Sequence, residues 1–220
     1  MTDQPQLPQR VVFLLGAGAS VEAKVPDTKG FVPAYSRFLR AGRWAWRKRG
    51  RSLFGSLCQR IEEWASRPEN QGKQLDVESL LDALALYRKG PQAIHSVLFG
   101  QASPLSPRDV RTAAWLELFL KDFIREQGIV RPANTDYLRP YLRYISDARP
   151  LDVFTVNYDS VMEQFLERNG RTYTDGFELE WTPRLFDDSP VDVRLYKLHG
   201  SVNWFATPFG RVLKIPIHPA

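Results

Sequence analysis

The hydrophobic pattern of the chain begins with a short strand and a glycine turn. Val11 to Leu15 are five consecutive apolar residues, mostly branched, and such a run predicts one short buried strand. The two glycines that follow favour a sharp turn and a close approach of backbone to a ligand, and a serine can then cap a helix that begins at Val21. This order points backbone N–H groups at a phosphate. The turn residues are Gly16, Ala17, Gly18, Ala19 and Ser20.

The glycine turn departs from the dinucleotide fingerprint of dehydrogenases. Val21 stands where the third glycine of that fingerprint is expected. No second strand ending in an acidic residue follows about 20 residues later. The turn therefore predicts a phosphate site of a different kind, or a turn without a ligand, and by itself it does not decide between the two.

A helical pattern runs from Phe31 to about Arg149. Apolar residues recur there at helical spacing in several stripes, and Asp76 is the expected cap of the helix that starts at Val77. The span is far longer than the single helix of a βαβ crossover. We therefore expect a helical lobe, inserted after the first strand, that forms a lid over the strand ends.

Strand patterns return in the last third of the chain. Leu151 to Val156 and Val191 to Leu198 each predict a strand, and a short strand or hairpin arm is expected within Arg211 to Ile217. The first of these leads into a turn and a helix, and the second into a loop with a histidine. The turn is Asn157, Tyr158 and Asp159, and the loop is His199, Gly200 and Ser201.

These segments together predict an α/β fold, a Rossmann-like parallel sheet with an inserted helical lid lobe. The core is expected at about residues 8–30 and 150–220 and the insertion at about 31–149, within a single domain spanning 1–220. Open α/β sheets bind ligands beyond the carboxyl ends of their strands. The glycine turn, Asn157 and His199 therefore share one position in the topology.

Composition narrows the class of protein and the chemistry. The chain has 220 residues, 43% hydrophobic and 25% charged, as in soluble globular proteins. No apolar run approaches the roughly 20 residues that cross a bilayer. Residues 1–10 hold no secretory segment, so a cytoplasmic protein without a membrane partner is expected. Cys58 is the only cysteine and the three histidines are scattered, which predicts no disulfide within the chain and no metal site.

The net charge of +5 is concentrated in one basic cluster, residues 43–51. Such a cluster interleaved with tryptophans can bind nucleic acid or an anionic surface. A solvated helix end with two inward tryptophans is the favoured interpretation, because charge runs are usually exposed faces. The residues are Arg43, Trp44, Trp46, Arg47, Lys48, Arg49 and Arg51.

The three motifs, taken in chain order, resemble the sirtuin family. They are residues 16–20, 155–159 and 197–201, each at the end of a predicted strand. More closely, they are similar to the sirtuin-like NAD-consuming domains of bacterial antiphage defence proteins, in the branch without a zinc module. Val25-Pro26-Asp27 is similar to the proline–aspartate loop of that family. The resemblance spans residues 11 to about 204 and is specific at the three motifs.

The resemblance implies NAD as the substrate and assigns the site residues. Asn157 and His199 are the catalytic candidates: Asn157 holds the ribose or the attacking water, and His199 acts as the base. Asp159 accepts a hydrogen bond from the nicotinamide carboxamide, and Asp27 lines that side of the pocket. The remaining residues expected to bind NAD are Gly16, Ala17, Gly18, Ser20, Gly200 and Ser201.

Each candidate also has a structural interpretation. Asn157 and Asp159 can cap the helix that begins near Ser160. His199 can be an ordinary turn histidine. No site role is expected for His95 or His218.

The function implied is an NAD+ hydrolase that releases nicotinamide and ADP-ribose and depletes NAD in antiphage defence by abortive infection. The four-cysteine zinc module of protein-deacylating sirtuins is missing, which disfavours deacylation. A non-catalytic sensor of NAD or ADP-ribose and a protein deacylase stay as alternatives. The chain is expected to be the front part of a longer protein that works as a homo-oligomer or with a sensor domain.

Overall fold

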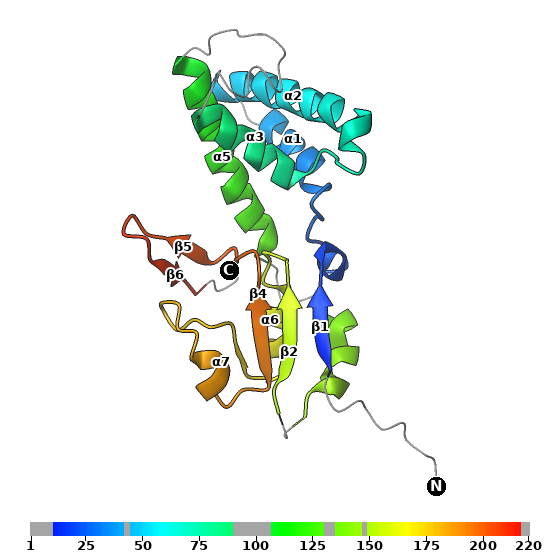
Figure 1. Ribbon diagram of the computed structural model, residues 1–220, viewed down its shortest axis with the longest axis vertical. Coiled ribbons are helices and arrows are strands. Elements are labelled where there is room, and N and C mark those ends of the chain that lie inside the picture. The colour runs from blue at the N-terminus through cyan, green and yellow to red at the C-terminus, as the bar shows by residue number, and fades with distance from the viewer. Residues whose placement is uncertain (1–10, 42–44, 90–106, 130–134, 147–148, 217–220) are drawn as a thin grey trace. The chain divides into compact units, whose positions relative to one another are not determined.

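A four-stranded parallel sheet organises the part of the chain that carries the three motifs (Figure 1). Its strands lie in the order β1 (Val12–Leu15), β2 (Leu151–Thr155), β4 (Val193–Lys197) and β3 (Tyr173–Thr174). The three longer strands are those predicted from the sequence, whereas β3 was not predicted. The α/β fold with a parallel sheet is confirmed, and its topology is consistent with a Rossmann-like fold.

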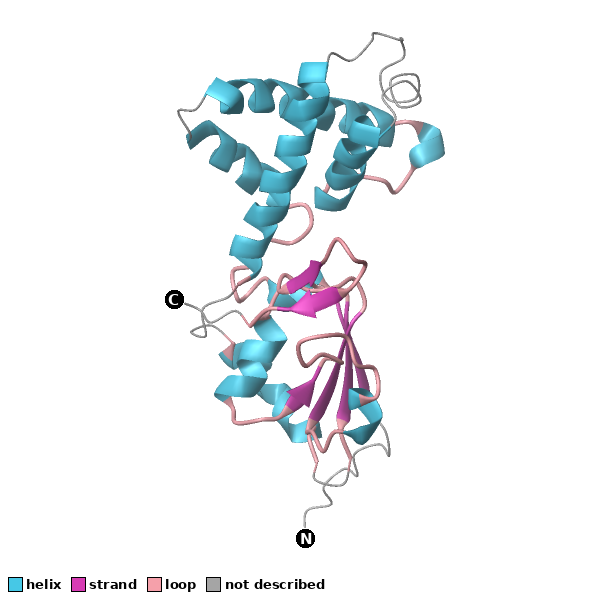
Figure 2. Ribbon diagram, turned by 90° about the vertical axis from the view of Figure 1, so that its left-hand side faces the viewer, coloured by secondary structure: helices cyan, strands magenta, loops and turns pink. Residues whose placement is uncertain are grey.

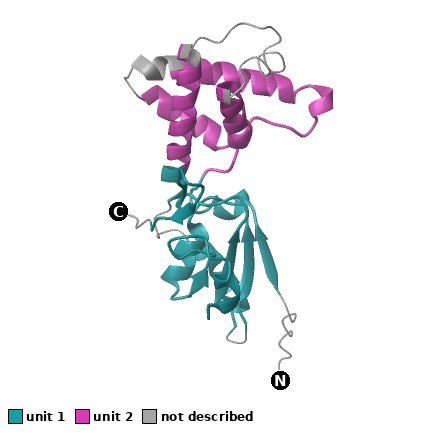
Figure 3. Cartoon of the chain, turned by 60° about the vertical axis from the view of Figure 1, so that its left-hand side comes forward, with its two compact units in different colours: residues 1–25, 125–220 teal, residues 26–124 magenta. Residues whose placement is uncertain are grey.

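The computed structural model describes residues 11–41, 45–89, 107–129, 135–146 and 149–216. They fall into two compact units (Figure 3). Unit 1 is residues 1–25 with 125–220, and unit 2 is residues 26–124. The sequence predicted a helical insertion at about residues 31–149, and the described residues 125–129 and 135–146 group with the sheet in unit 1.

One element of unit 1 explains this shift of the boundary. The segment η4 (Asp136–Tyr144) is a 3-10 helix, and Tyr141 and Tyr144 both pack edge-on against Phe13 of β1 with ring centroids 4.7 and 5.1 Å apart. The hydroxyl of Tyr137 donates to the carbonyl of Ala19 at 2.5 Å. The helical pattern predicted for this segment appears as a 3-10 helix, and two of its aromatic side chains pack on the first strand of the chain.

The sheet buries one face under α6 (Val161–Arg168), which lies behind β2 and β4 in Figure 1. Alternate residues of β4 point to this face, and Val193 and Leu195 are buried there. On the helix, Phe165 and Leu166 are each 1% exposed. This packing is the apolar core of unit 1.

The prediction that β1 is a buried strand is wrong for two of its residues. Leu14 is 73% exposed and Val12 is 49% exposed, whereas Leu15 is buried. β1 is one of the two edge strands of the sheet, and only one of its faces is covered within the described residues. An apolar run cannot distinguish a strand with two covered faces from one with a single covered face.

The glycine turn also differs from its prediction. Residues Ala17–Ser20 form a 3-10 helix, η1, with Gly16 at its N-cap and no side-chain cap. Ser20 is its last residue and caps nothing, and residues 21–24 form a turn instead of an α-helix. The turn is therefore tighter than the expected strand–turn–helix.

A short helix and a two-stranded hairpin also belong to unit 1 (Figure 2). The short helix α7 (Leu185–Asp188) precedes β4. After the histidine loop, β5 (Trp204–Ala206) and β6 (Val212–Lys214) pair antiparallel, which confirms the expected hairpin arm.

Unit 2 is helical, as the spacing of its apolar residues predicts. It holds α1 (Phe31–Ala41), α2 (Ala45–Ala65), η2 (Pro68–Asn70), α3 (Val77–Lys89) and most of α5 (Pro107–Gly128). The expected cap of α3 is confirmed, because Asp76 Oδ1 accepts from the N–H of Ser79 at 2.9 Å and Ser79 Oγ accepts from the N–H of Asp76 at 3.0 Å. Among the described helices, none has the length and apolar character to cross a membrane.

Candidate functional site

The ends of three parallel strands meet at one edge of the sheet in unit 1. The register pairs Leu15 with Thr155, and Thr155 with Lys197. Beyond the strands, Val156 donates to the carbonyl of Leu15 at 3.1 Å and Leu198 donates to the carbonyl of Thr155 at 2.9 Å. The glycine turn, the Asn157 turn and the His199 loop therefore leave the sheet side by side, as the topology predicts.

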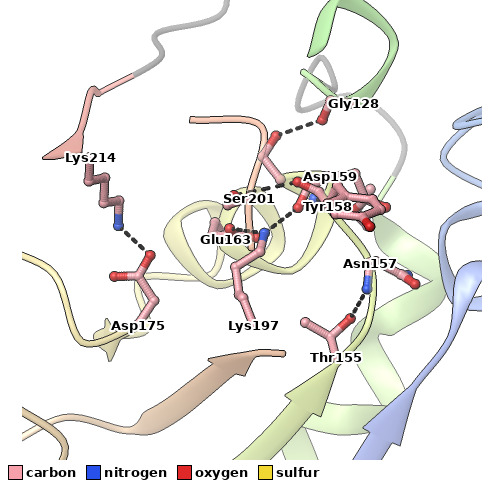
Figure 4. A network of polar contacts seen from close by, with 12 residues as sticks. Gly128, Thr155, Asn157, Tyr158, Asp159, Glu163, Asp175, Lys197, Ser201 and Lys214 are labelled. Atoms are coloured by element: carbon pink, nitrogen blue, oxygen red, sulfur yellow. Dashed lines mark hydrogen bonds and ion pairs between the residues drawn. The ribbon is translucent and has the colours of Figure 1, made fainter. Parts of the chain in front are cut away.

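Asn157 is bonded directly to the glycine turn. Its Nδ2 group donates to the carbonyl of Gly16 and to Oγ of Ser20, each at 2.9 Å. Its own backbone N–H donates to Thr155 Oγ1 at 3.0 Å (Figure 4). These bonds use both hydrogens of the amide, so Oδ1 is the atom of this side chain left to face a ligand.

The two glycines of the turn are not required by the folded chain itself. Neither Gly16 nor Gly18 has a positive φ, and a Cβ built on either would meet no atom within 4 Å. A glycine can serve an unusual backbone conformation, a close packing contact or the approach of a ligand. The first two do not apply at either position; Gly16 also stands at the N-cap of η1, where glycine is favoured, and the approach of a ligand is the role expected for both.

Asp159 performs the capping role considered as the alternative to ligand binding. Its Oδ1 accepts from the N–H of Val161 at 3.0 Å, at the first turn of α6, and the residue is 8% exposed. The turn is also packed closely, because a Cβ on Gly128 would lie 3.4 Å from Asp159 Cα. Ser160 donates its backbone N–H to the carbonyl of Gly128 at 3.0 Å. Asn157, by contrast, makes no capping bond with α6 among the described residues.

A buried ion pair joins two of the motifs, and the sequence analysis missed it. Lys197 Nζ lies 2.6 Å from Glu163 Oε1 on α6, and it also donates to the backbone carbonyl of Asp159 (Figure 4). Burial raises the pKa of the Glu163 carboxyl, and the Lys197 ammonium opposes that rise. A signal was available: Lys197 continues the buried alternation of Val193 and Leu195.

The histidine loop is held against the Asn157 turn. Val202 donates to the carbonyl of Tyr158 at 2.8 Å, and Ser201 Oγ donates to the same carbonyl at 3.4 Å. Gly200 has a φ of 91°, a conformation that favours glycine. The His199 ring is exposed, with its centroid 6.1 Å from that of the Tyr158 ring.

Asp27 is the one predicted site residue that the sheet does not bring to this edge. It belongs to unit 2, where its Oδ1 accepts from the N–H of Gly30 at 2.6 Å. A Cβ on Gly30 would lie only 2.9 Å from that oxygen, which explains the glycine. Its role toward a ligand stays a prediction.

The space at the motif junction is small. A void of about 10 Å³, lined by Ser20, Asn157 and Asp159 among others, lies beneath the junction. A larger cavity of about 510 Å³ in unit 1 is lined by Trp181, Trp204 and other aromatic residues, and neither Gly16, Asn157 nor His199 lines it. The larger cavity reaches the third motif only through Lys197 and Leu198.

The other sequence candidates give no competing site. In the described part of the chain, no group of three His, Cys, Asp or Glu side chains is placed to hold a metal ion. His95, His218, Arg43 and Trp44 lie outside the described residues. Of the basic cluster, only Arg51 has a described side chain, and it is exposed.

Comparison with known proteins agrees with the motifs. No curated protein matches the chain. Residues 152–212, which hold β2, α6, β4 and the His199 loop, match the family model of the SIR2-like domain. This match supports the resemblance to the sirtuin family on the segment that carries the second and third motifs, and it is consistent with a sirtuin-like domain there.

Proposed function

We propose that this protein hydrolyses NAD+ at the nicotinamide–ribose bond, giving nicotinamide and ADP-ribose. The SIR2-like match suggests an NAD-related function in general. The observation that carries the proposal is the bonding of Asn157 to Gly16 and Ser20 at the edge where the His199 loop also leaves the sheet. The proposed diphosphate-binding turn and the two candidate catalytic side chains thus lie at one edge of the sheet.

The glycine turn is the proposed diphosphate site. Gly16 and Gly18 leave open space above the backbone, and a phosphate oxygen needs that space to reach backbone N–H groups. Ser20 Oγ accepts from Asn157, so its hydroxyl hydrogen stays able to donate to an anion.

Asn157 and His199 are the proposed catalytic residues. Cleavage passes through an oxocarbenium-like state at the anomeric carbon, as in glycoside hydrolysis. Asn157 Oδ1 orients the attacking water, and His199 takes the proton of that water as its oxygen bonds to the anomeric carbon. The electron pair of the broken bond neutralises the nicotinamide ring, which leaves without needing a proton.

Asp159 is proposed to orient the nicotinamide carboxamide. One oxygen, Oδ1, is occupied by the N–H of Val161, and a carboxylate has a second oxygen that can accept. Asp159 therefore combines the two roles that the sequence presented as alternatives.

Incubation of the protein with NAD+ and measurement of nicotinamide by chromatography tests the proposal. We expect His199→Ala and Asn157→Ala each to lower turnover by at least about 100-fold, the scale of general base catalysis. His218→Ala is the matched histidine control and should keep the wild-type rate. An unchanged rate in His199→Ala, with folding verified by circular dichroism, would contradict the assignment.

The alternative functions give different outcomes in the same assay. Tight NAD+ binding without nicotinamide release would indicate a sensor module. Release that requires an acyl-lysine peptide would indicate a deacylase, although Cys58 is the only cysteine and the four-cysteine module is missing.

The cellular role proposed is depletion of NAD during phage infection, with control by self-assembly or by a sensor domain. Expression of the full protein in infected bacteria, with NAD measured over time, tests it. NAD should fall on infection with the wild-type protein and stay constant with His199→Ala. A fall that is equal in both strains would refute this role.

A further inference from the structure

Unit 2 contains a groove of about 600 Å³ between α1 and α2 that the proposed function does not use. Its floor includes the buried side chains of Val32, Leu39 and Phe54. Its volume lies within the range of small-molecule sites. The groove thus offers an apolar surface of suitable size within one compact unit.

Three cations line this groove, and they come from three different segments. Lys29 lies before α1, Arg40 is near its end, and Arg51 belongs to α2. All three are exposed, and none of their side chains forms an ion pair or hydrogen bond with another residue that the structure describes. Glu62 is the only acidic residue in the lining, so the groove carries a net positive charge.

The remaining lining residues add no charge and leave the groove open. Cys58 stays a neutral thiol, because burial, with a smaller effect of Glu62, raises its pKa to about 12. Gly55 lies inside α2, where glycine weakens a helix, and a Cβ there would meet no atom within 4 Å. Neither packing nor a positive φ explains this glycine, whereas the close approach of a ligand does.

We propose that this groove binds a small phosphate ester. Lys29, Arg40 and Arg51 hold the phosphate, and the organic part lies against the apolar floor beside Gly55. Charge-assisted hydrogen bonds from arginine to phosphate are strong and directional. The ring of Phe54 is buried, so the groove lacks the exposed aromatic platform on which single-stranded nucleic acids stack.

Isothermal titration calorimetry of the whole chain at low salt tests this proposal with three probes: phenyl phosphate, inorganic phosphate and phenol. Their comparison separates the contribution of the phosphate from that of the organic part. We expect phenyl phosphate to bind about tenfold or more tightly than inorganic phosphate, and phenol not to bind measurably. A labelled oligonucleotide is the fourth probe. If it binds with a steep salt dependence while phenyl phosphate does not bind, the groove is a nucleic-acid surface and the proposal is wrong.

Two matched pairs of variants place the binding in the groove. Arg40→Glu should weaken the binding of phenyl phosphate at least about tenfold. Arg37→Glu should change that affinity less than about twofold, because Arg37 is an exposed residue of α1 that does not line the groove, although the charge change is equal. Gly55→Leu should abolish binding and Ser56→Leu should not. Equal effects within either pair overturn the proposal, and Asn157→Ala should bind the probe as the wild type does.

Discussion

The ammonium group of Lys197 lies 2.6 Å from a carboxylate oxygen of Glu163, and the two side chains are only 0% and 5% exposed. The same ammonium donates to the backbone carbonyl of Asp159. One cation therefore connects the end of β4, the helix α6 and the turn after β2 (Figure 4). His199 follows Lys197 by two residues in the chain. The Lys197–Glu163 ion pair therefore helps to fix the spacing between the segments that carry Asn157 and His199.

Replacing Lys197 alone should strongly destabilise unit 1. Lys197→Met leaves the Glu163 carboxylate buried without its counter-ion, a change that costs about 3–5 kcal/mol. The double variant Lys197→Met, Glu163→Leu should recover much of this loss, because no buried charge remains. Urea unfolding measures both. A single variant as stable as the wild type would contradict the role of the pair.

The same variant should change the pH dependence of stability. Burial already raises the pKa of Glu163, and loss of Lys197 removes the group that opposes that rise. A carboxyl whose pKa is higher in the folded than in the unfolded state stabilises the folded protein at pH values below its pKa in the unfolded state. That stabilisation is lost as the pH rises through the pKa of the folded state. Lys197→Met should therefore be more stable near pH 5 than near pH 8, relative to wild type. Unfolding curves at both values test this, and equal losses would contradict it.

Substitution of the turn glycines should separate stability from binding. Gly16→Ala and Gly18→Ala meet open space and require no positive φ, so the free energy of unfolding should stay equal or rise by up to about 1 kcal/mol. NAD+ binding should fall, because the new methyl groups occupy the space of the diphosphate.

Gly176→Ala is the control for this pair. Gly176 has a φ of 81°, and a Cβ there would lie 2.4 Å from the Trp181 ring, so this variant should lose stability. Urea unfolding and calorimetric titration with NAD+ provide the two readouts. Unchanged NAD+ affinity in both turn variants would contradict the diphosphate assignment.

Asn157→Asp should loosen the glycine turn. The substitution replaces the donor Nδ2 by an oxygen that faces the carbonyl of Gly16, and an unmatched acceptor costs about 1–3 kcal/mol. The N–H of Ala19, which donates to Gly16, should exchange faster with solvent. Hydrogen exchange followed by mass spectrometry measures this, with α3 of unit 2 as the internal control. Equal exchange at residues 16–20 would argue against the bond.

The phenol of Tyr137 should make the glycine turn sensitive to alkaline pH. Burial, reinforced by Asp159 and Glu22, raises the pKa of Tyr137 from 10.0 to about 12. A group whose pKa is raised in the folded state stabilises the protein at pH values below its pKa in the unfolded state. For Tyr137 that stabilisation is lost as the pH rises from 10 to 12. Tyr137→Phe also removes the hydrogen bond to Ala19, at about 1 kcal/mol near neutral pH.

The difference between wild type and Tyr137→Phe isolates this residue from other titrating groups, such as Tyr173, whose pKa burial also raises. The stability advantage of the wild type should shrink between pH 10 and 12. Thermal unfolding across that interval is the measurement. A constant difference would indicate that the hydroxyl does not titrate in the folded protein.

Local patterns were sufficient to predict the three main strands, the helical character of most of the described residues between 31 and 124, and the placement of the motifs at strand ends. Each depends on spacing within one segment, such as the alternation in β4 or the cap formed by Asp76 and Ser79. Parallel pairing then follows from topology, because strands that share a direction end at the same edge. The convergence of Gly16, Asn157 and His199 was predictable for this reason.

Tertiary structure alone decided the partners of the side chains. No local pattern tells that Asn157 bonds to Gly16 and Ser20, which lie more than a hundred residues earlier, or that Tyr141 packs on Phe13. The burial of Lys197 against Glu163 depends on how α6 crosses the sheet, and the exposure of Leu14 depends on β1 lying at its edge. Sequence spacing determines which face of an element is apolar, whereas contacts between distant segments depend on packing that only the folded chain defines.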